Sequence, residues 1–166
     1  ETSDESEIIE GIAEHIGEMM EENSDLLIIW GSGGTLRRMA KHLGFAKTVL
    51  GIDVVQDGII IAGDVNEFDL LKLLSAHNGK SLILLSPMGG QGFLIGRGNL
   101  QISPAVIRQV GIDGVLGIAT PAKLLTLTTL RIDSGERTLD DEFRTKKYLK
   151  VLQGYRTTRL IKVSQE

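Results

Sequence analysis

The stretch LLIIWGSGGTLRRMAKHLG, residues 26–44, predicts a strand, a glycine turn and a helix in direct succession. Its first five residues are all apolar, as expected for a strand that is buried on both faces. Apolar residues then recur at helical spacing from Leu36 to Leu43, and Gly44 follows them as a typical helix terminator. A strand that leads through a glycine turn into a helix is the basic unit of an α/β domain.

The same order of elements recurs further along the chain. Residues 81–85 form a second apolar run, residues 86–101 a long glycine-rich loop, and residues 103–111 a helix with Ser-Pro at its start and glycine at its end. A third apolar run follows at residues 115–119. Strands that alternate with helices predict a mostly parallel sheet with helices on both faces.

Two parts of the chain interrupt this alternation. The apolar runs at residues 48–55 and 59–62 flank Asp57-Gly58, a strong signal for an antiparallel hairpin. The tail, residues 126–163, is interpreted as antiparallel strands that cover one edge of the sheet. The predicted fold class is therefore α/β, with a mostly parallel sheet, helices on both faces and antiparallel C-terminal strands at an edge.

An amphipathic helix precedes this alternating part. Its apolar residues, at helical spacing, are Ile8, Ile9, Ile12, Ala13, Ile16, Met19 and Met20. Gly11 and Gly17 weaken such a helix by about 1 kcal/mol each, so we expect it to depend on docking through its apolar face. We therefore divide the chain into an amphipathic N-terminal helix, residues 1–24, and an α/β nucleotide-binding-type domain, residues 25–166.

The net charge of −4 is distributed unevenly. Residues 1–25 contain ten acidic residues and no Lys or Arg. The other 12 acidic residues are outnumbered by the 18 Lys and Arg, so the rest of the chain carries +6. An acidic chain argues against a nucleic-acid partner, whereas the basic body favours a small phosphate-bearing ligand.

Composition excludes several further classes. The absence of Cys excludes thiol nucleophiles and thiolate zinc sites, and the three separated histidines suggest no metal site and no nucleophile–base pair. Apolar runs of five residues, such as 26–30, fall far short of the roughly 20 residues that a membrane span needs, so no membrane association is expected. Because neither an initiator Met nor a signal-like segment begins the sequence, we expect an internal fragment of a longer cytoplasmic chain.

Glycine is enriched, with 20 of 166 residues, and glycines gather between predicted strands and helices. There they allow close backbone approach, and the helix N-terminus offers free N–H groups and partial positive charge, which suits a phosphate. GSGGT at residues 31–35 is neither a complete GxGxxG fingerprint nor a P-loop, so a plain tight turn stays open beside phosphate or ribose binding. For residues 86–101 we favour a binding loop; the alternative is a short buried strand at residues 93–95 whose bends the glycines make.

Two charged residues outside these loops are further candidates. Asp53 stands in an apolar run, where an unpaired carboxylate is costly to bury. It could accept a hydrogen bond from a ribose hydroxyl or from the GSGGT turn, or pair with an Arg or a backbone N–H. Lys123 follows a strand end and could reach a phosphate or lie solvated.

We expect these groups to converge at one end of the sheet, where parallel strands present their carboxyl ends to ligands. The candidate ligand-binding residues are Gly31, Ser32, Gly33, Gly34, Thr35, Arg37, Asp53, Gly89, Gly90, Gln91, Gly92, Arg97, Asn99, Gln101 and Lys123.

Several segments carry a family likeness: GSGGTLRRMAKHLG, KTVLGIDVVQDG with DVNE, SPMGGQGFLIGRGNLQISP, ATPAKL and LQGY. Together they resemble the C-terminal region of the ATP-NAD kinase-like proteins, which include the AcoX-like proteins of acetoin catabolism. The resemblance covers residues 25–163, and GGQGFLIGRGNLQISP is its most specific block. It implies that this chain contributes NAD or ATP binding to an ATP-dependent phosphorylation of NAD, with Mg²⁺ in the full-length enzyme.

One departure from the family pattern matters. The GGDGT motif, whose Asp belongs to the phosphoryl-transfer site, lies in the family's N-terminal domain, and GSGGT places Gly33 where that Asp would stand. We therefore name no catalytic residue and expect this chain, without an N-terminal kinase domain as partner, to form no NADP.

Two other functions stay open. The first is a regulatory or oligomerisation domain, in which the apolar face of residues 8–20 docks on a sister subunit or on the missing domain. The second is a sugar-phosphate isomerase-like domain, because enzymes of that type also have two glycine loops. We further expect a homo-oligomer.

Overall fold

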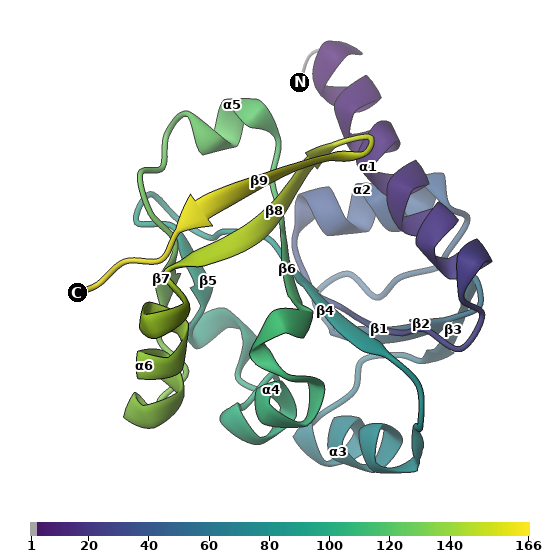
Figure 1. Ribbon diagram of the computed structural model, residues 1–166. Coiled ribbons are helices and arrows are strands. Elements are labelled where there is room, and N and C mark those ends of the chain that lie inside the picture. The colour runs from purple at the N-terminus through teal and green to yellow at the C-terminus, as the bar shows by residue number, and fades with distance from the viewer. Residues whose placement is uncertain (1–2) are drawn as a thin grey trace.

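A seven-stranded mixed sheet forms the centre of the computed structural model, which describes residues 3–166 apart from the side chains of Ser3 and Arg97. The strand order is β3-β2-β1-β4-β6-β8-β9 (Figure 1). Four central strands run parallel: β1 (Leu27–Trp30), β4 (Ser81–Leu85), β6 (Val115–Ile118) and β8 (Tyr148–Gly154). Antiparallel strands form both edges: β2 (Asp53–Gln56), β3 (Ile59–Ala62) and β9 (Thr157–Lys162). The predicted fold class is confirmed, including the antiparallel C-terminal strands at an edge.

Helices cover both faces of this sheet, as predicted (Figure 1). One face packs against α1 (Ser3–Glu22) and α2 (Gly34–His42). The other packs against α3 (Glu67–Ala76), α4 (Pro104–Val110) and α6 (Arg137–Lys146). Alternate side chains of β1 contribute to the hydrophobic cores on both faces: Ile28 and Trp30 face α1 and α2, whereas Leu27 and Ile29 face the other layer of helices. Among residues 3–166, no helix combines the length and apolar character needed to cross a membrane.

Helix α1 packs on the sheet through its predicted apolar face. The residues of this face that are at most 4% exposed are Ile9, Ile12, Ala13, Ile16 and Met20. The β8–β9 turn also holds the helix, because Tyr155 Oη donates to Glu18 Oε2 over 2.6 Å and Arg156 donates to Glu18 Oε1 over 3.0 Å. Docking of this face on a sister subunit or another domain is therefore a wrong prediction, since the chain itself covers it.

Local signals behave as the sequence predicts. Asp57 and Gly58 both have positive φ, 50° and 75°, as a two-residue type I′ hairpin turn requires. The Ser103 hydroxyl caps α4, as the Ser-Pro at its start predicts. Asn66 likewise caps α3, in a reciprocal capping box with Asp69.

The tail matches its interpretation as antiparallel strands only in part: β8 and β9 are antiparallel, but a helix and a parallel strand precede them. Residues 137–146 form α6, which contributes only Leu139 and Phe143 to the hydrophobic core. Two apolar residues four apart are too few for a clear helical pattern, so the sequence does not reveal this helix. Strand β7 (Arg131–Ile132) pairs in parallel with β5 (Phe93–Ile95) in a separate two-stranded sheet. The short strand that was the alternative interpretation of residues 93–95 is therefore present.

Candidate functional site

The two glycine-rich segments begin side by side at the carboxyl ends of parallel strands. Trp30 of β1 pairs with Leu84 of β4, so the turn after β1 and the loop after β4 leave the sheet at the same edge. Gly31 N donates to Leu84 O over 3.0 Å, and a Cβ on Gly31 would lie 2.5 Å from that oxygen. Strand packing alone is enough to require glycine at position 31.

The amino end of α2 is open above this edge. Gly33, with φ 117°, precedes the helix, and no side chain caps it. A Cβ added to Gly33 or Gly34 would meet no atom within 4 Å, so the backbone here faces open space. Thr35 is half-buried in the first turn, and Arg37 is exposed. An uncapped helix N-terminus with a nearby cation is a favourable place for an anion.

Hydrogen bonds join this turn to the second loop and to α5 (Pro121–Leu124). Ser32 Oγ donates to Asn99 Oδ1 over 3.2 Å, and Asn99 is only 6% exposed. Lys123 Nζ donates to the carbonyl oxygen of Gly89 over 3.4 Å. These contacts bring GSGGT, the second loop and Lys123 together at one end of the sheet, as expected. That they bind a ligand stays a prediction.

Asp53 lies at the same end of the sheet, opposite the last residue of β1, but its carboxylate is used within the chain. It is fully buried. Thr48 N, Thr48 Oγ1 and Asp64 N donate to it over 2.7–2.8 Å, and Lys47 Nζ lies 3.6 Å away. Three of the about four acceptor positions of a carboxylate are thus used, and Lys47 lies beside Oδ2, the oxygen that accepts only one of these bonds. Because Asp53 is also fully buried, a ribose hydroxyl has no access to it. The alternative of internal pairing holds, with lysine in place of arginine.

This buried pair explains why β2 begins at Asp53 rather than at residue 48, since residues 47–52 form a loop around the carboxylate. Burial acts to raise the pKa of Asp53, but hydrogen bonds from Asp64 and Thr48 and the charge of Lys47 outweigh it and hold that pKa below its ordinary value. Burial lowers the pKa of Lys47, and the attraction of Asp53 offsets only part of this effect. We interpret the pair as the anchor of this loop.

The other candidates in the second loop differ in exposure. Its exposed tip consists of Gly89, Gly90 and Gln91. Gly92 is buried, and a Cβ on it would approach Thr129 O to 2.8 Å, so packing alone requires this glycine. Gln101 is half-buried, and the Arg97 side chain lies outside the described part of the chain. Among the candidate residues of this loop whose side chains the structure describes, the exposed ones are therefore those at its tip.

A cavity of about 420 Å³ beside this tip includes residues that sequence reasoning does not single out. Met88 and Asp133 line it together with Phe93. Met88 and Phe93 meet through an antiparallel bridge, and Asp133 follows β7, which pairs with β5. No spacing in the sequence indicates this group, because it depends on the pairing of separate segments.

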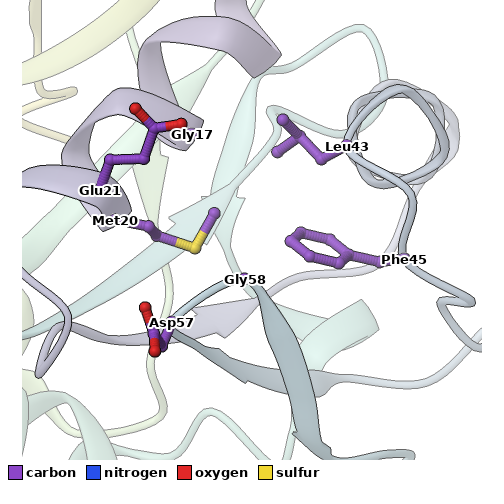
Figure 2. Close-up of a pocket in the computed structure, with 7 residues that line it drawn as sticks. All are labelled: Gly17, Met20, Glu21, Leu43, Phe45, Asp57 and Gly58. Carbon is purple, nitrogen blue, oxygen red and sulfur yellow. The ribbon is translucent and has the colours of Figure 1, made fainter.

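A smaller cavity of about 200 Å³ lies at the opposite end of the sheet. It opens between the C-terminal half of α1, the residues directly after α2 and the β2–β3 turn. Met20 and Phe45 point toward one another across it (Figure 2). Its charged lining residues, Glu21 and Asp57, are both acidic. This cavity is therefore unsuited to a phosphate.

Comparison with known proteins gives one clear result. No curated protein and no solved structure matches the chain. Residues 23–163 match the family described as the ATP-NAD kinase C-terminal domain, as the motifs around both glycine loops suggested. Because this match spans nearly the whole sequence, the chain belongs to the ATP-NAD kinase C-terminal domain family.

Proposed function

We propose that this domain contributes the phosphate-binding part of an NAD or ATP site to an NAD kinase-like enzyme that phosphorylates NAD with ATP. Its family supports the assignment to NAD kinase chemistry. One observation carries the finer statement: the uncapped N-terminus of α2 is joined to the second glycine loop by the hydrogen bond between Ser32 and Asn99. Two segments that each suit a phosphate thus share one edge of the sheet.

In this proposal, backbone N–H groups at the start of α2 donate to phosphate oxygens, and the helix dipole adds attraction. Gly33 and Gly34 leave the necessary space, since nothing lies within 4 Å of an added Cβ. Lys123 Nζ would exchange its 3.4 Å contact with the neutral carbonyl of Gly89 for a stronger hydrogen bond to a negatively charged phosphate oxygen. Arg37 supplies a second positive charge, on an exposed residue.

The role proposed for this chain is binding and orientation of a nucleotide. Asp53, a carboxylate at the same edge, is enclosed by its own partners and is not proposed as an acid or base. Within residues 3–166, no three His, Asp or Glu side chains gather as ligands for a metal ion, so we assign no side chain of this chain to Mg²⁺.

Isothermal titration calorimetry on the 166-residue chain tests the proposal. NAD, ATP and pyrophosphate should bind, whereas nicotinamide riboside, which has no phosphate, should bind far more weakly than NAD. Lys123→Met should weaken binding of each phosphate ligand about tenfold, because it removes a charged donor. Lys72→Met is the matched control, since Lys72 is exposed on α3. The proposal fails if no phosphate ligand binds, or if the control variant loses as much affinity as Lys123→Met.

A further inference from the structure

The cavity beside the loop tip has two apolar walls in a defined arrangement. Met88 and Phe93 form an antiparallel bridge with both hydrogen bonds, Met88 N to Phe93 O over 2.8 Å and Phe93 N to Met88 O over 3.2 Å. Directly paired residues of this kind project their side chains to the same side, and both residues line the cavity. The guanidinium of Arg131 lies 5.6 Å from the centre of the Phe93 ring and steadies it by a cation–π contact.

Glycines keep the remaining walls flat. A Cβ on Gly98 would overlap the terminal methyl group of Met88, and a Cβ on Gly96 would lie 3.5 Å from Phe93 Cδ1. The thioether of Met88 and the phenyl ring of Phe93 both make favourable contacts with the face of an aromatic ring. A cavity with flat walls between these two groups therefore fits a planar ring better than a branched group. The volume of about 420 Å³ falls in the range of small-molecule sites.

The rim of the cavity carries a hydrogen-bond acceptor. Asp133 is held by its backbone, since Asp133 N donates to Ile95 O over 2.8 Å. No hydrogen bond or ion pair joins its carboxylate to another side chain that the structure describes. An ionised carboxylate only accepts hydrogen bonds, and it repels phosphate. It therefore favours an N–H donor in this cavity and directs phosphate elsewhere.

We propose that Met88, Phe93 and Asp133 form a subsite for a planar heteroaromatic ring that carries an N–H donor. This chemistry is shared by the amino group of adenine and the carboxamide of nicotinamide. The inference rests on the proposed function, in which phosphate lies at the start of α2. The two sites adjoin, because Gly98 lines the cavity and its neighbour Asn99 is hydrogen-bonded to the glycine turn. One nucleotide can then place its ring in the cavity and its phosphate on the turn.

The test is calorimetric titration of the 166-residue chain with AMP, NMN and pyrophosphate, which carry adenine, nicotinamide and no ring, respectively. Phe93→Leu keeps apolar bulk but removes the aromatic face. Asp133→Asn keeps the shape of the rim but removes its charge. Phe68→Leu is the matched control, because Phe68 is 72% exposed on α3.

Phe93→Leu and Asp133→Asn should each weaken AMP or NMN binding about three- to tenfold, and neither should weaken pyrophosphate binding. The nucleotide that responds identifies the ring, and Phe68→Leu should change nothing. If both nucleotides bind both variants as tightly as the original chain, or if pyrophosphate weakens by the same factor, the subsite is refuted while pyrophosphate binding keeps the proposed function. If the original chain binds none of the three, the proposed function fails and the subsite fails with it.

Discussion

Replacement of Gly34 by aspartate should weaken phosphate binding while leaving the domain at least as stable. Gly34 is the first residue of α2, and a Cβ there would meet no atom within 4 Å. A carboxylate in the first turn of a helix stabilises it by about 0.3–1 kcal/mol through the helix dipole. Loss of a helical glycine adds a similar amount. The folded chain therefore has no reason to lose stability.

The same carboxylate would repel a phosphate bound at this N-terminus. Two unit charges about 4 Å apart interact by about 1 kcal/mol in water and about 4 kcal/mol at the effective dielectric constant near a protein surface. Since about 1.4 kcal/mol is a tenfold change in affinity, the dissociation constant for pyrophosphate, NAD or ATP should rise about five- to several-hundredfold.

Calorimetry at low salt and thermal unfolding together measure both effects. Gly34→Asn is the control, because asparagine has the shape of aspartate without its charge. The two variants should have similar melting temperatures but different affinities, and added salt should narrow the difference by screening. Equal affinity of both variants for NAD and pyrophosphate would show that no phosphate binds at the start of α2.

Three further predictions concern stability. The pKa of Asp53 lies below its ordinary value, so its carboxylate stabilises the fold above the unfolded pKa of about 3.9, and this stabilisation is lost as pH falls through the lower folded pKa. The free energy of unfolding of Asp53→Asn, measured with urea, should therefore fall less steeply on acidification than that of the original chain. Asp53→Asn should also be about 3 kcal/mol less stable at neutral pH. Thermal unfolding should show Gly31→Ala to be about 1–3 kcal/mol less stable, because its Cβ would meet Leu84 O at 2.5 Å. In the same measurement, the stability of Gly90→Ala, whose Cβ would lie in open space, should change by no more than about 0.5 kcal/mol. Ile12→Ala should cost about 2–5 kcal/mol in urea unfolding because Ile12 is fully buried; a loss below about 0.5 kcal/mol would mean that α1 is not part of the core.

Local signals in the sequence predicted most of the elements. The hairpin at Asp57-Gly58 depends on the φ values of two residues, and the cap at Ser103 depends on one hydrogen bond three residues along the chain. Because both act within a few residues, they form largely independently of the rest of the fold. Helix α6 was not predicted, because only Leu139 and Phe143 of this helix pack in the hydrophobic core and two apolar residues give no clear helical pattern. Such a helix is stabilised by the surface on which it packs more than by its own pattern.

The candidate site was predicted in outline, because strands that run parallel present their following loops at one edge. That rule brings Ser32 to Asn99 and Lys123 to Gly89. It does not say which residue of a loop points into open space. The grouping of Met88 with Asp133 depends on the bridge at the loop tip and on the pairing of β5 with β7, which no spacing in the sequence records.

The sequence by itself determined the α/β class, the family and the contrast between an acidic first helix and a basic body. Only the tertiary structure decided that Gly31 and Gly92 serve packing while Gly33 and Gly34 face open space, and that Asp53 is enclosed by the loop at residues 47–52. The physical reason is that apolar periodicity specifies how much surface each strand buries, but burial is non-directional and many strand orders satisfy it. The steric and hydrogen-bonding constraints on a single residue come from atoms that are far away in the sequence. These constraints exist only after the strands have paired in their final order.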